Sequence, residues 1–193
     1  MKHTLRTFVA IEIGSANRAR AEELIETFRA AEADVKWVGP ENLHLTLKFL
    51  GEVKSRETHR VCEAVQRGAA KVDPFEFELR GAGAFPNARR PRTLWIGGGM
   101  GEEEMIALHD HVDAALGKLG FRKEHRRFHP HLTIGRVRRG GPGVVELGQL
   151  VEQYVNFSAG RVSVRQAVIF SSQLTGSGPI YEALGRAKLG GGE

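Results

Sequence analysis

The sequence has a single cysteine, Cys62, so no disulfide bond can form within its 193 residues. The lack of a disulfide framework favours a reducing compartment, and we expect a cytoplasmic protein. Long apolar runs are also missing, since none approaches the roughly 20 residues of a membrane-spanning helix. The apolar stretch that begins at Phe8 is interrupted by Glu12 and lacks a small-residue cleavage site. It therefore predicts a first strand and not a signal peptide.

Acidic residues are fewer than basic ones, 23 against 28, which gives a net charge of +5 and a sequence pI near 9.7. This surplus would favour a polyanionic partner such as RNA, through counterion release and electrostatic steering. A solvated surface can carry the same charge, so the charge does not identify a nucleic-acid-binding protein. The composition, 41% hydrophobic and 26% charged, is typical of a globular chain.

The spacing of apolar residues predicts an α+β protein. We expect one domain over residues 1–187 and a flexible tail over 188–193. Strands are predicted over residues 7–13, 35–38, 43–49, 75–79, 93–96, 131–137, 161–170 and 180–184. Helices are predicted over residues 15–28, 55–65, 102–119 and 146–154, and a loop over 81–92.

One four-residue motif occurs twice, 87 residues apart: His44-Leu45-Thr46-Leu47 and His131-Leu132-Thr133-Ile134. Each copy lies in a predicted strand, where alternate side chains point to opposite faces. The histidine and threonine of each copy therefore share one face, while the leucine or isoleucine side chains face a core. Each half of the chain would present one imidazole and one hydroxyl.

Two such pairs facing each other across a cleft would suit in-line displacement at phosphorus. One neutral imidazole can take a proton from water while a protonated one gives a proton to the leaving oxygen. Histidine can fill both states near neutral pH because its ordinary pKa is about 6.5. Thr46 and Thr133 can donate hydrogen bonds to the non-bridging phosphate oxygens. This chemistry needs no metal and no cofactor.

A single His-x-Thr sequence on a strand is weak support for catalysis, because such a histidine is usually structural. Two copies, each in an alternating strand and one in each half of the chain, favour the paired interpretation.

The chain resembles the RNA 2′,3′-cyclic phosphodiesterases, also called 2′-5′ RNA ligases, of the two-histidine phosphoesterase superfamily. The resemblance covers nearly the whole chain and includes both histidine motifs. The segments that carry it are Phe8-Val9-Ala10-Ile11, Trp37-Val38, Glu41 to Gly51, Gly83-Ala84-Phe85-Pro86, Pro91 to Trp95 and Phe128 to Arg136.

The resemblance implies a bilobed fold of two pseudo-symmetric lobes, each an antiparallel sheet flanked by helices, with the active site in the cleft between them. It implies an enzyme that hydrolyses RNA 2′,3′-cyclic phosphate ends to 2′-phosphates. By that analogy His44 is the proton donor to the 3′ oxygen and His131 is the proton acceptor from water; the near-equal motifs would also allow the reverse. ATP-independent 2′-5′ ligation would follow from microscopic reversibility. We expect a monomer whose partner is such RNA, with no membrane association.

Two further residues resemble substrate-binding residues of the family: Arg136 at the phosphate and Phe49 against the terminal base. Each lies five positions after its histidine, so ideal alternation would point both away from the site. They reach it only if their strands bend or end there, and for Phe49 a core position is an equal alternative. Lys48 shares the alternation of His44 and could meet the RNA backbone, although a solvated lysine is the usual outcome.

The remaining histidines give no strong metal signal. His125 and His129 could suggest zinc, but Pro130 interrupts the run, no carboxylate is suitably spaced, and the neighbouring arginines oppose a cation. His109 and His111 lie two apart on a predicted helix, cannot share a face, and are expected in solvent. The basic stretch over residues 122–127 and the arginines over 89–92 could follow an RNA backbone or could form solvated surfaces.

Two rival functions stay open. The same chemistry could act on a cyclic phosphate of a small nucleotide, or the chain could be a non-catalytic RNA-binding protein. Arginine or lysine would serve mere phosphate binding better than histidine at these strand positions, which counts against the second alternative.

Overall fold

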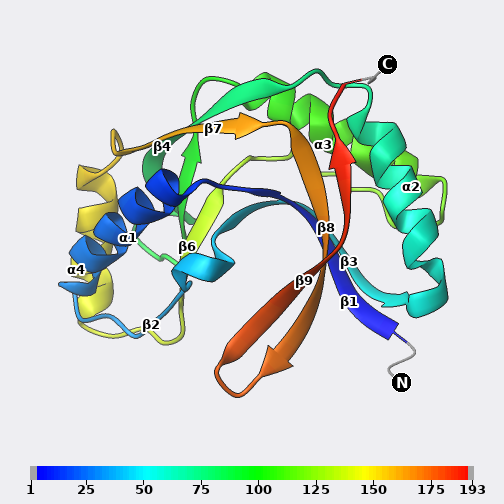
Figure 1. The fold of residues 1–193 in the computed structure, drawn as a ribbon. Helices are drawn as coiled ribbons and strands as arrows, with labels where there is room; N and C mark the ends of the chain where they lie inside the picture. The colour runs from blue at the N-terminus through cyan, green and yellow to red at the C-terminus, as the bar shows by residue number, and fades with distance from the viewer. Residues whose placement is uncertain (1–3, 191–193) are drawn as a thin grey trace.

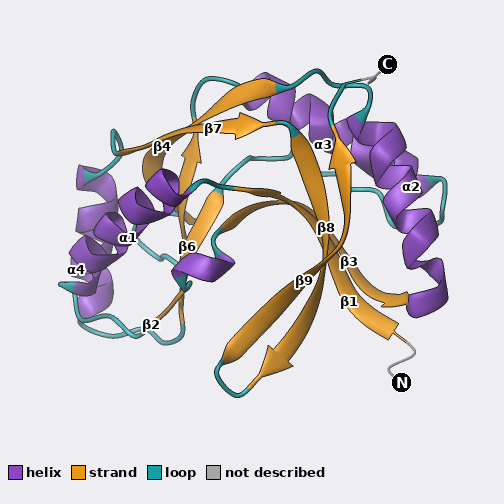
Figure 2. Cartoon of the chain, viewed as in Figure 1, coloured by secondary structure: helices purple, strands orange, loops and turns teal. Residues whose placement is uncertain are grey.

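The computed structural model describes residues 4–190, which form one antiparallel sheet of nine strands and four α-helices (Figures 1 and 2). The strands are β1 (Thr4–Glu12), β2 (Val35–Trp37), β3 (His44–Lys54), β4 (Phe75–Phe85), β5 (Thr93–Gly98), β6 (Leu132–Val137), β7 (Ser158–Val164), β8 (Gln166–Thr175) and β9 (Gly178–Lys188). The helices are α1 (Ser15–Arg29), α2 (Thr58–Ala69), α3 (Glu102–Gly117) and α4 (Gly143–Gln153). The predicted α+β class is confirmed. None of the helices within the described range is long and apolar enough to cross a bilayer.

The order of strands in the sheet is symmetric about its centre. Eight strands run in the order β7-β4-β5-β6-β3-β1-β8-β9, so β6 and β3 lie in the middle and β5 and β1 flank them, while the short β2 pairs with β6 outside this order. The central strands pair only at Leu45 and Leu132, which are themselves 87 residues apart. The repeat in the sequence is therefore a repeat in the sheet. In place of the separate sheet expected for each lobe, the two halves share one continuous sheet.

The first helix of each half packs against the other half. Helix α1 follows β1 but packs on β6 and β7, whereas α3 follows β5 and packs on α2, β3 and β4. Their first residues, Ser15 and Glu102, are also 87 apart. Figure 1 shows α1 with α4 at one side of the curled sheet and α2 with α3 at the other. Each half therefore covers part of the other.

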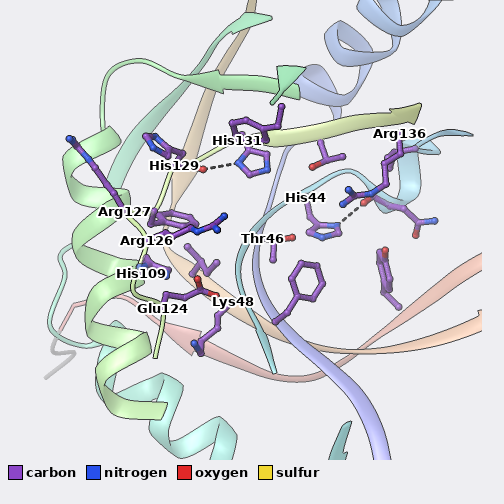
Figure 3. A pocket seen from close by; sticks show the side chains of 18 residues that line it. His44, Thr46, Lys48, His109, Glu124, Arg126, Arg127, His129, His131 and Arg136 are labelled. Atoms are coloured by element: carbon purple, nitrogen blue, oxygen red, sulfur yellow. Dashed lines mark hydrogen bonds between the residues drawn. The ribbon is translucent and has the colours of Figure 1, made fainter. Parts of the chain in front are cut away.

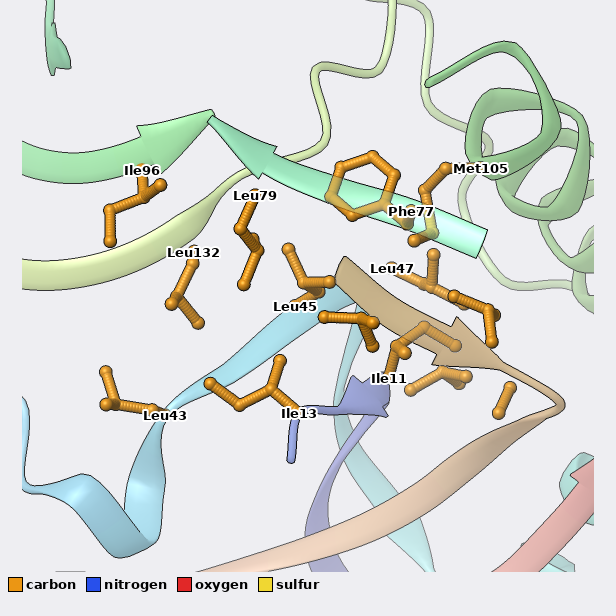
Figure 4. Close-up of a cluster of buried hydrophobic side chains, with 14 of the residues drawn as sticks. Ile11, Ile13, Leu43, Leu45, Leu47, Phe77, Leu79, Ile96, Met105 and Leu132 are labelled. Carbon is orange, nitrogen blue, oxygen red and sulfur yellow. The ribbon is translucent and has the colours of Figure 1, made fainter. Parts of the chain in front are cut away.

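The apolar positions of the two motif strands form the centre of the core. Leu45, Leu47, Leu132 and Ile134 are all nearly inaccessible to solvent and belong to one buried cluster. Figure 4 shows three of these leucines among side chains from β1, β4, β5 and α3. Burial of each such side chain contributes about 1.5–3 kcal/mol to folding, so both strands are held firmly from this face.

Two segments of the sheet differ in kind from the prediction. The predicted loop over 81–92 begins with strand, because β4 continues to Phe85 along β5. The single strand predicted over 161–170 is two strands that meet at Arg165. They lie in opposite halves of the sheet, β7 beside β4 and β8 beside β1. The pattern of burial also changes there, from alternating Val162 and Val164 in β7 to the continuous run Ala167-Val168-Ile169 in β8.

The flexible tail predicted over 188–193 begins too early. Lys188 is the last residue of β9, and Leu189 is 6% exposed. The Leu189 N–H donates to Arg165 O at 2.9 Å, and the Gly190 N–H donates to Val72 O at 2.7 Å. Residues 188–190 are thus held by backbone hydrogen bonds, and 191–193 lie outside the described residues.

A buried ion pair joins β3 to α3. The Lys48 Nζ lies 2.5 Å from Asp113 Oδ1 and donates to Arg122 O at 2.8 Å. Lys48 is only 4% exposed, so its expected position in solvent was wrong. Removal of one partner would leave the other charge buried without compensation.

Lys48→Met is expected to lower the free energy of unfolding by about 3–5 kcal/mol, because it leaves the Asp113 carboxylate buried without its partner. Urea unfolding followed by circular dichroism measures the change. Lys54→Met, on the exposed end of the same strand, serves as the control and should stay within about 0.5 kcal/mol of the parent. Equal stability of the two variants would show that the buried pair contributes nothing.

Candidate active site

The two motif histidines have the same hydrogen-bonding arrangement. The Nδ1 atom of His44 lies 2.7 Å from Asn42 O, and that of His131 lies 2.7 Å from His129 O, in each case the residue two positions earlier. A carbonyl oxygen can only accept, so Nδ1 carries the hydrogen and donates it. In the neutral ring Nε2 is then the free acceptor, and both rings turn the same atom toward a substrate.

Both motif strands have an extra residue immediately after the threonine. Along β1, Ala10 is opposite Thr46 and Val9 is opposite Lys48, so Leu47 has no partner of its own. Along β5, Trp95 is opposite Thr133 and Leu94 is opposite Gly135, which leaves out Ile134 in the same way. Such β-bulges shift the alternation of the residues that follow. The two bulges occupy equivalent positions of the repeat.

The bulges explain how the fifth residue after each histidine reaches the site. Phe49 is 61% exposed, so its alternative position in the core was wrong. Arg136, at the equivalent position, is exposed and donates from Nη1 to Thr93 Oγ1 at 3.2 Å. The same shift turns Lys48 away from the face of His44 and into the interior. The bulge in β3 thus accounts for the positions of Lys48 and Phe49, and the bulge in β6 accounts for that of Arg136.

The six site residues predicted from the sequence line one cavity of about 380 Å³. They are His44, Thr46, Phe49, His131, Thr133 and Arg136. Figure 3 shows the two imidazoles entering this space from β3 and from the start of β6, with the Thr46 hydroxyl nearby. An anionic group in the cavity would meet two imidazoles, two hydroxyls and a guanidinium.

Aromatic rings surround both imidazoles. The ring centroids of Phe8 and Tyr181 lie 5.0 and 5.3 Å from that of His44. Phe85 and Trp95 lie 5.0 and 6.3 Å from His131. Phe8 and Trp95 are again 87 residues apart, so part of this shell repeats as well. The rings exclude water from the sides of the imidazoles.

No signal in the sequence indicated a role for Tyr181, because it lies on β9, far along the chain from either motif. Phe85 belongs to a segment that supported the family resemblance, but nothing in that segment indicates contact with a histidine ring.

The aromatic surroundings affect protonation. Burial lowers the pKa of His44 below its ordinary value, and the hydrogen bond to Asn42 O opposes this only in part. Burial also lowers the pKa of His131; the hydrogen bond to His129 O opposes this in part, and Arg136 and the His129 ring lower the pKa further. Desolvation disfavours the charged imidazolium. The lowered pKa values favour the neutral form of both rings near neutral pH.

Of the other histidines, His109 lies in a different environment from the one predicted. His109 is 4% exposed and stacks in parallel on Phe128, with centroids 4.2 Å apart, so its expected position in solvent was wrong. Its Nδ1 also lies 2.9 Å from Asp110 Oδ1. Within residues 4–190, no group of three or more His, Cys, Asp or Glu side chains is placed to hold a metal ion.

Comparison with known proteins places these features in a family. The family model described as LigT-like phosphoesterase matches residues 11–95 and 99–181. An RNA 2′,3′-cyclic phosphodiesterase of Methanothermobacter thermautotrophicus is 37% identical over 177 residues, which cover 92% of this chain and 95% of that protein. The protein of the same name from Archaeoglobus fulgidus is 39% identical over 181 residues, 93% of this chain and 98% of the relative.

Solved structures agree with this grouping. The crystal structure of a Thermus thermophilus protein, TT0787, has a TM-score of 0.79 at 27% identity and covers 98% of this chain and all of that chain. Escherichia coli LigT, solved in complex with NADP+, shares the fold with a TM-score of 0.70 at 24% identity, over 98% of this chain and 99% of that one. The chain belongs to the LigT-like phosphoesterase family, and the resemblance inferred from its two histidine motifs is confirmed.

Proposed function

We propose that this chain hydrolyses the 2′,3′-cyclic phosphate at the 3′ end of RNA and leaves a 2′-phosphate. The observation that carries the proposal is the equivalence of the two motifs in space. Both histidines donate Nδ1–H to the carbonyl two residues earlier, both precede a β-bulge, and both line one cavity. Relatives that match nearly the whole chain are named as enzymes of this activity.

The reaction uses one ring on each side of the phosphorus. His131 takes a proton from water through Nε2 as the water oxygen forms a bond to phosphorus. The bond between phosphorus and the 3′ oxygen breaks, and protonated His44 gives its proton to that oxygen. The products are a 3′-hydroxyl and a 2′-phosphate, and the proton gained by one histidine replaces the proton lost by the other. No metal takes part in this scheme.

The charges around the rings support these roles. Arg136 and His129 disfavour the protonated form of His131, which suits a base that begins neutral. The pKa of His44 is lowered by burial and not by a neighbouring cation, so a bound phosphate anion can restore its proton. Thr46 and Thr133 donate to the non-bridging oxygens, and Arg136 binds the phosphate. Phe49 lines the cavity and is 61% exposed, so its ring can stack on the terminal base.

If an RNA 5′-hydroxyl takes the place of water, the same steps form a 2′-5′ phosphodiester without ATP. This ligation is a related activity of the same site. A purely RNA-binding role is less compatible with the site, because two half-buried imidazoles with lowered pKa values offer a phosphate less positive charge than arginine or lysine would.

Both motif histidines should be needed for hydrolysis. His44→Ala and His131→Ala should each lower kcat/KM for an RNA oligonucleotide ending in a 2′,3′-cyclic phosphate by at least about 10²–10⁴-fold, since each removes one proton transfer. His59→Ala, at a histidine whose side chain is 81% exposed on α2, is the matched control and should leave the rate unchanged. Chromatography of the products in the presence of a chelator measures the rate and identifies the phosphate.

A 3′-phosphate product would contradict the assignment of the leaving oxygen. Activity that returns only with an added divalent metal would contradict the acid–base scheme.

The rate of hydrolysis should depend on pH through the two histidines. Reaction from free enzyme needs one protonated and one neutral imidazole. The pKa values of both histidines are lowered from the ordinary value of about 6.5. The acid therefore loses its proton as the pH rises through a value below about 6.5. The kcat/KM profile should therefore be bell-shaped, with its maximum on the acid side of about pH 6.5 and a steady fall above it. A profile that still rises at about pH 8 would be inconsistent with these two groups.

The hydroxyls of the two motif threonines should stabilise the transition state. Thr46→Val and Thr133→Val keep the side-chain shape but remove a donor to the charge that develops on phosphate oxygen, so kcat should fall by about 10²–10³-fold in each. Thr27→Val on α1, where the hydroxyl donates to Glu23 O, is the control. If kcat stays within about threefold of the parent while only KM rises, the threonines bind the ground state and not the transition state.

A further inference from the structure

Two arginines of the loop between α3 and β6 form a part of the cavity wall that the proposed reaction does not use. Arg126 and Arg127 line the same cavity as His44 and His131. In Figure 3 they lie on the other side of the histidines from Arg136. Both are exposed, and within residues 4–190 no carboxylate lies within ion-pair distance of either guanidinium.

The start of this loop is fixed by the buried ion pair. Lys48 donates to Arg122 O, and the Glu124 N–H donates to Asp113 Oδ1 at 3.4 Å. Asp113 also accepts from Lys48. The loop backbone is therefore tied at two nearby points to β3, the strand that carries His44, and to α3.

The end of the loop is fixed by stacking. His109 lies one helical turn before Asp113 on α3, and its buried ring is parallel to that of Phe128 at 4.2 Å, with 2° between the ring planes. Phe128 directly follows Arg127. The two guanidinium groups are thus carried by a short segment held at both ends, so less conformational entropy is lost when they bind a ligand.

The charge of this wall suits a phosphate. Guanidinium groups bind phosphate oxygens in a forked geometry. Glu124 lines the same region and contributes one negative charge, so together with the two arginines the wall has a surplus of one positive charge. Replacement of both arginines by neutral residues would reverse its sign.

In RNA, the phosphate nearest to a terminal 2′,3′-cyclic phosphate is the phosphodiester on the 5′ side of the last nucleoside. We propose that Arg126 and Arg127 bind this second phosphate, and so make the enzyme select RNA ends over nucleoside cyclic phosphates. The inference rests on the proposed function, and it names the part of an RNA end that the site would recognise beyond the cyclic phosphate.

The test compares two small substrates that differ by one phosphate: a nucleoside 2′,3′-cyclic phosphate with a free 5′-hydroxyl and the same compound with a 5′-phosphate. The parent enzyme should have a kcat/KM about tenfold or more higher for the 5′-phosphorylated substrate. The double variant Arg126→Gln/Arg127→Gln should lose this preference while its kcat/KM for the 5′-hydroxyl substrate stays within about twofold of the parent. Arg60→Gln/Arg67→Gln, two exposed residues of α2, makes the same change in charge away from the cavity and should keep the preference.

Equal rates of the parent enzyme on both substrates would overturn the second phosphate site. So would an equal loss on both substrates in the loop variant, because the arginines would then act on the cyclic phosphate itself. A thermal unfolding midpoint equal to that of the parent shows that the variant is folded.

Binding of the 2′-phosphate products, with and without a 5′-phosphate, tests the site separately from catalysis. If the parent hydrolyses neither substrate, the proposed function fails, whereas tighter binding of the 5′-phosphorylated product, lost in the loop variant, would still support the arginine site. Equal affinity for the two products would contradict it.

Discussion

The pairing of β3 with β6 at the centre of the sheet is the constraint on which the site depends. Leu45 and Leu132 are opposite each other at the one register position these strands share, and each is flanked by the histidine and threonine of its motif. Since both leucines are buried in the core, neither strand can slide without exposing apolar surface. The positions of the two imidazoles relative to one another are therefore set by the core on the opposite face of the sheet.

The β-bulges add the second part of this arrangement. Without them, strict alternation would place Phe49 and Arg136 in the core. With one extra residue in each strand, the cavity gains an aromatic ring on one side and a guanidinium on the other. The same shift sends Lys48 to Asp113, where the pair fixes the loop that carries Arg126 and Arg127. The local backbone of β3 thus affects both ends of the cavity.

Much of the fold and of the site could be predicted from the sequence because the relevant signals are local. Alternation in β3 and β6 places each histidine beside its threonine, and the close repeat of the motif indicates two related halves. The bulges could not be predicted, because they are defined by the register against β1 and β5 and not by any residue of the bulged strand. The buried states of Lys48 and His109 were missed for a similar reason. Their partners, Asp113 and Phe128, become neighbours only when α3 and the following loop fold against β3 and the cavity.

The action of the two imidazoles on opposite sides of one phosphorus atom can be tested with a substrate that has sulfur in place of the 3′ bridging oxygen. A thiolate leaves without a proton because the pKa of a thiol is about 8.5, far below that of an alcohol. On this substrate we predict that His44→Ala recovers to within about tenfold of the parent rate, while His131→Ala stays deeply impaired, because water still needs a base. Equal recovery of both variants, or of neither, would contradict the division of roles between the two rings.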